Sequence, residues 1–262
     1  MVSDYLKHSR DLDEVYALID KNRADAARAA QAKFHNDMEA AIATIGSIGA
    51  IASARVQADS RVASAKVLIN AELAATRLLA EAEVQASRCA EQAATKPQEV
   101  VEAALLEIGR HTSVSLIAAA KDSVERIQQD ADAAIKLLRE TGAIAIREIQ
   151  TLGENVMQHT RHAAEMAAEK LKEYRKQTHT LDQASADGED LAQLVRKTAE
   201  DASSQLAQAI KTVLADINAT TDAACAAVLD AALAAEAKIL EGQERASARL
   251  TETLRHFAAG SA

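Results

Sequence analysis

The sequence has very few of the residues that fill the interior of a globular protein. Of its 262 residues only 2% are aromatic, tryptophan is absent, and there are one proline and eight glycines. Globular domains use aromatic side chains to fill their cores and glycine and proline in the turns between short elements. A composition rich in Ala, Glu, Lys, Arg and Leu, with 48% hydrophobic residues, instead favours long helices that pack through small side chains, and it is too apolar for a disordered chain.

Dense basic blocks, signal-like segments and long apolar runs are missing as well. The net charge of −9 is spread along the chain, so we expect no nucleic-acid partner. Residues 1–10 lack the apolar segment of a secretory signal. The longest uncharged run, residues 40–54, is shorter than the ~20 residues that cross a bilayer, so we expect it to be core. Cys89 and Cys225 stand among alanines, as small buried hydrophobes do, which fits a reducing, cytoplasmic location.

Apolar residues recur at every eleventh position along most of the chain. Eleven residues make three helical turns at 3.67 residues per turn, slightly more than in an unstrained α-helix, and such a repeat predicts helices that wind around one another in a right-handed supercoil. We therefore expect long hendecad coiled-coil helices. The predicted core consists of the apolar residues at this interval: Phe34, Ile45, Val56, Val67, Leu78, Leu105, Leu116, Ile127, Leu138, Ile149, Val195, Leu206, Ile217, Val228, Ile239 and Leu250.

Small residues recur at the same interval beside the core. Glycine inside a helix costs roughly 1 kcal/mol relative to alanine. Gly109, Gly142 and Gly153 belong to one such column. They therefore indicate a seam that another helix backbone approaches closely, although glycines at kinks or helix ends would give the same sequence pattern. Gly46 and Gly49 are read in the same way. The predicted seam residues are Ala41, Ala52, Ala63, Ala74, Gly109, Ala120, Ala131, Gly142, Gly153, Ala164, Ala224 and Ala235.

Local signals divide the chain into three helices. Ser9 before an acidic turn predicts a helix start near Asp11. Thr95 and Gln98 have capping-box spacing around Pro97, which favours a break there, while a kinked continuous helix stays an alternative. The expected segments are an end segment at 1–10, helices at 11–96 and 97–180, a loop at 181–190, a helix at 191–257 and a fraying tail at 258–262.

The loop at residues 181–190 rests on its composition. Its sequence, LDQASADGED, gathers Ser, Asp and Gly, which is typical of a loop. Gly188 is expected to cap the C-terminus of a helix, and Glu189 and Asp190 to open the next one.

Groups that carry chemistry are scarce. His159, His162 and Glu165 share one helical face, but such residues on alanine-rich helices usually form a polar face, so we expect no metal site. The sequence holds no glycine-rich phosphate loop and no turn that presents a nucleophile. We therefore expect no catalytic residues, no cofactor, no small-molecule substrate and no enzymatic activity.

Two further columns shape the expected outer surface. Arg55, Lys66, Arg77 and Arg88 follow the repeat; we expect their side chains to reach acidic groups on an adjacent helix, and a basic ridge for anionic lipid is the alternative. A second apolar column beside the core gives the first helix two apolar faces, which one antiparallel partner does not cover. Self-association would bury the second face. That column contains Ile51, Val62, Leu73 and Val84.

The eleven-residue repeat resembles the hendecad coiled coils of stalk-like and filament-forming bacterial proteins, over about residues 11–257. A weaker similarity links the alanine-rich helices to phasins, which coat storage granules, and to the eleven-residue repeats of lipid-surface proteins. In this chain, however, Ala and Gly stand where a lipid-facing stripe has Leu, Phe or Trp.

The sequence as a whole predicts an all-α protein with two or three long hendecad helices in an elongated bundle or rod. The expected function is structural: self-assembly with copies of itself, through the Ala/Gly seams, into a filament, tube or extended bundle. A phasin-like coat on a granule or membrane surface is the first alternative. A soluble rod that binds a partner is the second.

Overall fold

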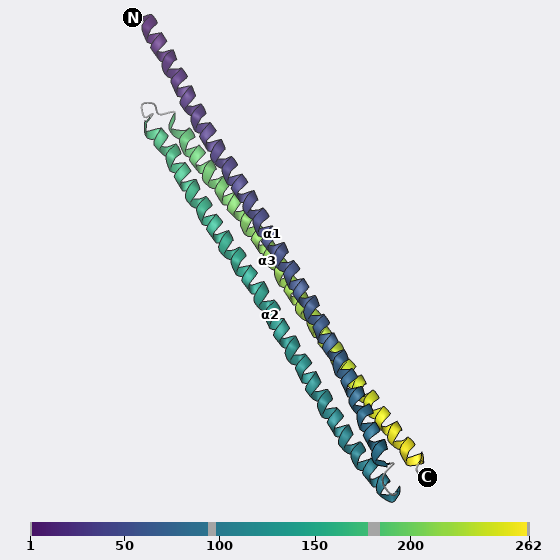
Figure 1. Ribbon diagram of the computed structural model, residues 1–262. Helices are drawn as coiled ribbons and strands as arrows, with labels where there is room; N and C mark the ends of the chain where they lie inside the picture. Colours follow the sequence, from purple (N-terminus) through teal and green to yellow (C-terminus); the bar gives the residue numbers. More distant parts are fainter. Residues whose placement is uncertain (1, 94–97, 178–183, 261–262) are drawn as a thin grey trace. The chain divides into compact units, whose positions relative to one another are not determined.

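The chain is all-α, and its three long helices form a bundle (Figure 1). The computed structural model describes residues 2–93, 98–177 and 184–260, with the side chains of Glu14, Ala17, Leu18 and of residues 21–91, 105–173 and 190–256. Helix α1 spans Val2–Ala93, α2 spans Gln98–Gln177 and α3 spans Ala184–Gly260. The break expected around Pro97 lies between α1 and α2, and Thr95 and Pro97 themselves lie outside the described residues.

The first helix begins nine residues earlier than we expected. We predicted a separate end segment at residues 1–10, but α1 begins at Val2, so this prediction is wrong. Residues 2–10 contain no glycine or proline that would interrupt a helix, and Asp4 places a carboxylate in its first turn, where the helix dipole favours negative charge.

The third helix also extends beyond its predicted limits. The loop predicted at 181–190 is wrong from residue 184 onward, because α3 begins at Ala184 and Gly188 lies within it instead of capping a helix. Alanines and the acidic Asp187, Glu189 and Asp190 favour the first helical turns enough to offset one glycine. At its other end α3 includes residues 258–260 of the predicted tail, where two alanines precede Gly260.

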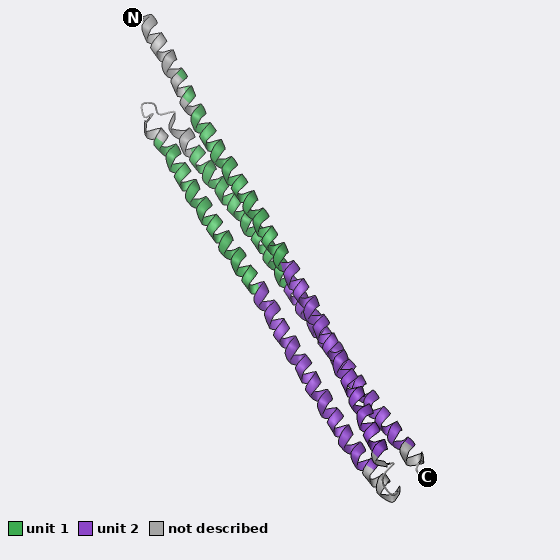
Figure 2. Cartoon of the chain, in the orientation of Figure 1, with its two compact units in different colours: residues 1–52, 143–218 green, residues 53–142, 219–262 purple. Residues whose placement is uncertain are grey.

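The chain divides into two compact units, and each contains a segment of all three helices (Figure 2). Unit 1 comprises residues 1–52 and 143–218. Its core includes Ile45 of α1, Ile149 of α2 and Leu206 of α3 in one cluster. The α1 and α3 segments run in the same direction, since Gln31 bonds Thr198 and Gly49 faces Val213 further along both helices.

Unit 2 comprises residues 53–142 and 219–262 and has the same internal arrangement. Val67, Ile127 and Val228 share its main core cluster with the next residues of each column, Leu78, Leu116 and Ile239. Along the axis of this unit, residue numbers rise in α1 and α3 while they fall in α2, so α2 is antiparallel to the other two helices. Because all three helices repeat every eleven residues, each three-turn step brings the same kinds of residue together again.

Candidate functional surfaces

The predicted core columns lie inside the three-helix units. Every one of the core residues predicted from the repeat is buried, with 0% to 5% of its surface exposed. Cys89, at the end of the α1 column, packs with Leu105 in unit 2. The interval of eleven residues therefore identifies the inward face of each helix over its whole described length.

The predicted seam residues lie at contacts between helices of the same chain. A Cβ atom placed on Gly153 would be 2.2 Å from Ile210 Cδ1, one on Gly142 would be 2.6 Å from Thr221 Oγ1, and one on Gly109 would be 2.8 Å from Leu254 Cδ1. The glycine column of α2 thus admits α3 side chains. The other predicted seam residues are buried or half-buried: Ala41, Ala52, Ala63, Ala74, Ala120, Ala131, Ala164, Ala224 and Ala235.

Two glycines behave differently from the prediction. Gly46 was expected at a close contact, but a Cβ atom there would meet nothing within 4 Å. Gly242 was not identified from the sequence. A Cβ atom at Gly242 would be 2.7 Å from Ala75 Cβ and 3.0 Å from Ala75 Cα, so among the described glycines this is the one where an added Cβ would meet backbone atoms of another helix.

A few hydroxyl groups are buried among the apolar residues. Ser60 Oγ of α1 donates a hydrogen bond to the Ala224 carbonyl oxygen of α3 at 2.9 Å. Thr160 is buried at the α2 column position after Ile149, and its hydroxyl donates to the Val156 carbonyl of its own helix. Sequence reasoning missed both, although Thr160 was detectable as the polar residue that interrupts an apolar column.

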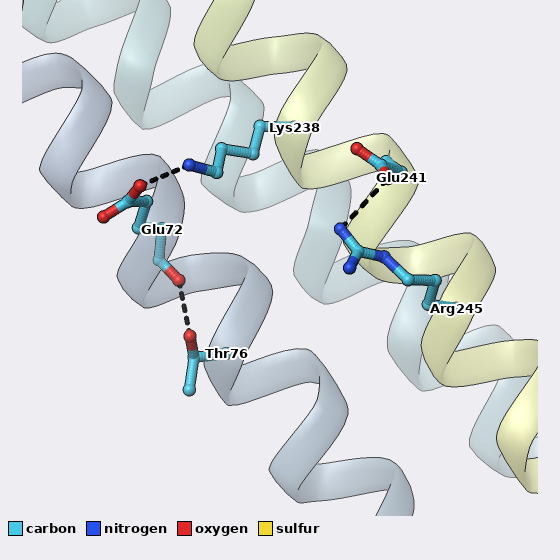
Figure 3. A network of polar contacts seen from close by, with 5 residues as sticks. All are labelled: Glu72, Thr76, Lys238, Glu241 and Arg245. Carbon is cyan, nitrogen blue, oxygen red and sulfur yellow. Dashed lines mark hydrogen bonds and ion pairs between the residues drawn. The ribbon is translucent and has the colours of Figure 1, made fainter.

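Ion pairs between α1 and α3 follow the repeat in unit 2. Lys238 pairs with Glu72, and eleven residues further along both helices Arg249 pairs with Glu83. Figure 3 shows Lys238 of α3 reaching across to Glu72 of α1, while Arg245 pairs with Glu241 within α3. The acidic groups of α1 and the basic groups of α3 are therefore partly neutralised by each other.

The basic column of α1 does not behave as we expected. Lys66 alone reaches a neighbouring helix, at 3.7 Å from Asp130 of α2. Arg55 pairs with Asp59 in its own helix. Within the described part of the chain Arg77 and Arg88 form no ion pair; both side chains are exposed, and Arg77 lines a cleft between α1 and α2.

The second apolar column of α1 stays exposed. The bundle leaves 66% of Ile51, 69% of Val62, 52% of Leu73 and 50% of Val84 accessible to solvent. Each of them is followed four residues later by a member of the basic column, so apolar and basic side chains are neighbours on this helix surface. This amphipathic column is the most regular exposed feature of α1.

The groups that could carry chemistry are dispersed. His159, His162 and Glu165 are all exposed on α2, and no three His, Cys, Asp or Glu side chains are arranged to hold a metal ion in the described ranges. Cys89 and Cys225 are free thiols in the interior. Burial raises the pKa of the Cys89 thiol, and the protonated thiol is a poor nucleophile.

Two of the cavities in unit 2 differ in the character of their lining. A cleft of about 390 Å³ between α1 and α2 is lined by charged and polar groups, among them Arg77, Glu81, Arg126 and Asp130. A more apolar groove of about 770 Å³ between α2 and α3 is lined by Leu106, Val114 and Leu254, with Arg110 and Arg255 beside them. Neither cavity contains a grouping typical of a catalytic centre.

Among the described residues, one helix is long and apolar enough to cross a membrane by length and composition. It is the part of α1 from Lys21 to Glu91, where the most apolar window has a mean hydropathy of 1.2. Core helices of soluble proteins pass the same test, and 28% of this window is buried inside the structure.

Comparisons with known proteins support the fold alone. No protein-family model and no curated protein matches the sequence. Among solved structures the chain is similar to a computationally designed three-helix bundle, with a TM-score of 0.58 and 14% identity over 93% of this chain and 99% of the other. This similarity shows a three-helix bundle.

Proposed function

We propose that this chain is a structural protein that assembles with copies of itself into a filament, tube or extended bundle. The supporting observation is the exposed apolar column of α1, which the three helices of the chain leave uncovered. Burying each half-exposed side chain of this column against another copy would stabilise the assembly by about 1 kcal/mol. The role is then mechanical or organisational and requires no cofactor, catalytic group or small-molecule substrate.

The proposed assembly uses the outer faces of the helices. We first expected copies to meet through the Ala/Gly seams, but the spaces beside Gly142 and Gly153 are filled by Thr221 and Ile210 of the same chain. The seams thus hold one chain together, and the outer columns are left to bind the next copy.

Analytical ultracentrifugation over a wide range of concentration, followed by negative-stain microscopy, tests this proposal. We expect the mass to rise with concentration above the 27.8 kDa of one chain and to see filaments, tubes or bundles. A mass of one chain at every concentration would contradict self-assembly. A small oligomer of fixed size would instead fit the soluble partner-binding protein.

A coat on an anionic granule or membrane surface is the second candidate function. It is favoured by the basic column Arg55, Lys66, Arg77 and Arg88, which lies next to the exposed apolar column as in helices that lie on lipid surfaces. Flotation with vesicles of phosphatidylcholine and phosphatidylglycerol separates the candidates, because a self-assembling protein stays in the lipid-free fraction.

A further inference from the structure

The outer face of α1 in unit 2 is apolar and basic. Val62, Leu73 and Val84 repeat along it, and Ile69 is exposed beside them. The intervening positions hold exposed alanines, such as Ala58 and Ala80, which would allow another helix to approach closely.

The outer face of α3 in the same unit is apolar and acidic. Leu229, Leu233 and Leu240 have 52%, 58% and 44% of their surface exposed. Exposed alanines again lie near them, at Ala226 and Ala237. Leu229 and Leu240 are eleven residues apart, the same interval as Leu73 and Val84 on α1.

The charges beside these two faces are opposite and unneutralised. Arg77 and Arg88 of α1 form no ion pair with any described residue. The same is true, over the described side chains, of three exposed carboxylates on α3: Asp222, Asp230 and Glu244.

The ion pairs within the unit explain this separation of charge. Glu72 and Glu83 of α1 are paired with Lys238 and Arg249 of α3 on the side where the two helices touch. Those pairs take up acidic groups of α1 and basic groups of α3. Over the described side chains, the groups left without an ion pair are then mainly basic on the outer face of α1 and mainly acidic on that of α3, with Arg255 among the exceptions.

Resting on the proposed function, we propose that the α1 outer face of one copy binds the α3 outer face of a second copy, apolar column against apolar column and arginines against carboxylates. The two surfaces differ, so the contact is heterologous: each copy keeps one free α1 face and one free α3 face for further copies. Such a contact generates a ring or an open polymer. Because the two faces have opposite charges, contact between an α1 face and an α3 face is favoured over contact between two α1 faces or two α3 faces.

Charge reversal tests this pairing. The double variants R77E/R88E and D230K/E244K each give the two faces of one copy the same sign of charge. We expect both variants to fold, because these side chains are exposed and make no ion pair in the unit. We expect each alone to sediment as a single chain at concentrations where the unaltered protein associates.

Two combinations are expected to restore association. In an equimolar mixture of the double variants, the acidic α1 face of R77E/R88E can bind the basic α3 face of D230K/E244K. The basic α1 face of D230K/E244K can likewise bind the acidic α3 face of R77E/R88E. The quadruple variant carries both exchanges in one chain, so its α1 and α3 faces again have opposite charges. The matched control is K136E/R139E, which makes the same charge change at exposed residues of α2 and is expected to associate as the unaltered chain does.

The outcomes separate this inference from the proposed function. If the unaltered protein associates and both double variants associate equally well, the α1–α3 pairing is wrong while self-assembly stands. The pairing is also wrong if both variants dissociate but neither the mixture nor the quadruple variant recovers. If the unaltered protein never associates, self-assembly and the pairing fail together. Binding of the unaltered protein, but not R77E/R88E, to phosphatidylglycerol vesicles without self-association would assign the surface to lipid.

Discussion

Gly242 of α3 lies directly against Ala75 of α1, at a distance that leaves no room for a methyl group. The obstacle is the backbone and Cβ of Ala75 and not the end of a flexible side chain. Relief of a clash here requires α1 and α3 to move apart, so this glycine fixes how closely the two helices approach in unit 2.

The substitution Gly242→Ala is expected to destabilise the protein. Overpacking of this kind typically costs about 1–3 kcal/mol, and because a backbone atom is among those met we expect the cost to exceed the roughly 1 kcal/mol that alanine gains over glycine in a helix. The matched control is Gly46→Ala, where a Cβ meets nothing within 4 Å, and stability should rise. Urea unfolding followed by circular dichroism measures both. Equal stabilisation by the two substitutions would show that the contact with Ala75 yields easily.

Neighbouring leucines of α2 test the core assignment. Leu138 is 1% exposed, whereas Leu137 is 56% exposed. We expect Leu138→Ala to lower the free energy of unfolding by about 2–5 kcal/mol, because it leaves a cavity between three helices. Leu137→Ala should change it by less than about 0.5 kcal/mol. Chemical denaturation of both variants is the measurement, and similar losses at the two positions would contradict the assigned inward face.

Removal of the exposed apolar column separates folding from association. In the double variant Leu73→Gln/Val84→Gln, two half-exposed side chains become polar, so the unfolding temperature should stay within a few degrees of the unaltered value. The mass measured by sedimentation should fall toward that of one chain. Retention of the full assembly by this variant would remove the observation on which the proposed function rests.

The buried thiol of Cys89 predicts a loss of stability at alkaline pH. Its folded-state pKa lies above the ordinary value of 9.0 because burial disfavours the thiolate. Above 9.0 the unfolded chain releases this proton while the folded chain retains it, so the Cys89 contribution is complete below 9.0 and declines as the pH rises toward the folded-state pKa.

Lysines and tyrosines titrate in the same range, so the comparison uses Cys89→Ala. Between pH 8 and 10 we expect the free energy of unfolding of this variant to fall less steeply than that of the unaltered chain. Identical slopes for the two proteins would mean that Cys89 titrates as it does in the unfolded chain.

The inward faces of the helices were predictable because one rule applies along each of them. The repeat that joins Ile45 to Val56 and Val67 also joins Leu206 to Ile217 and Val228, and all six are buried. Helix ends were harder to locate, because nothing between Val2 and Asp11 interrupts a helix and Gly188 is tolerated within one. The handedness of the supercoil stays a prediction.

Single contacts without a periodic signature were not predictable. Gly242 follows Ala231 and precedes Thr253 in its column, so nothing in the repeat marks it as a close contact. The Gly142 and Gly153 column was detectable, but periodicity gives the same signal whether the approaching helix belongs to the same chain or to another copy. The structure was therefore needed to identify the helix that packs against each seam.

The contacts between α1 and α3 keep a nearly constant separation in sequence. Their hydrogen bonds join residues that are 163 to 167 positions apart in both units, close to a whole number of eleven-residue repeats. Loss or duplication of one repeat in each helix would therefore return every remaining residue to an equivalent neighbour. During evolution the length of such a chain can therefore change in steps of three helical turns while the packing between the helices stays the same.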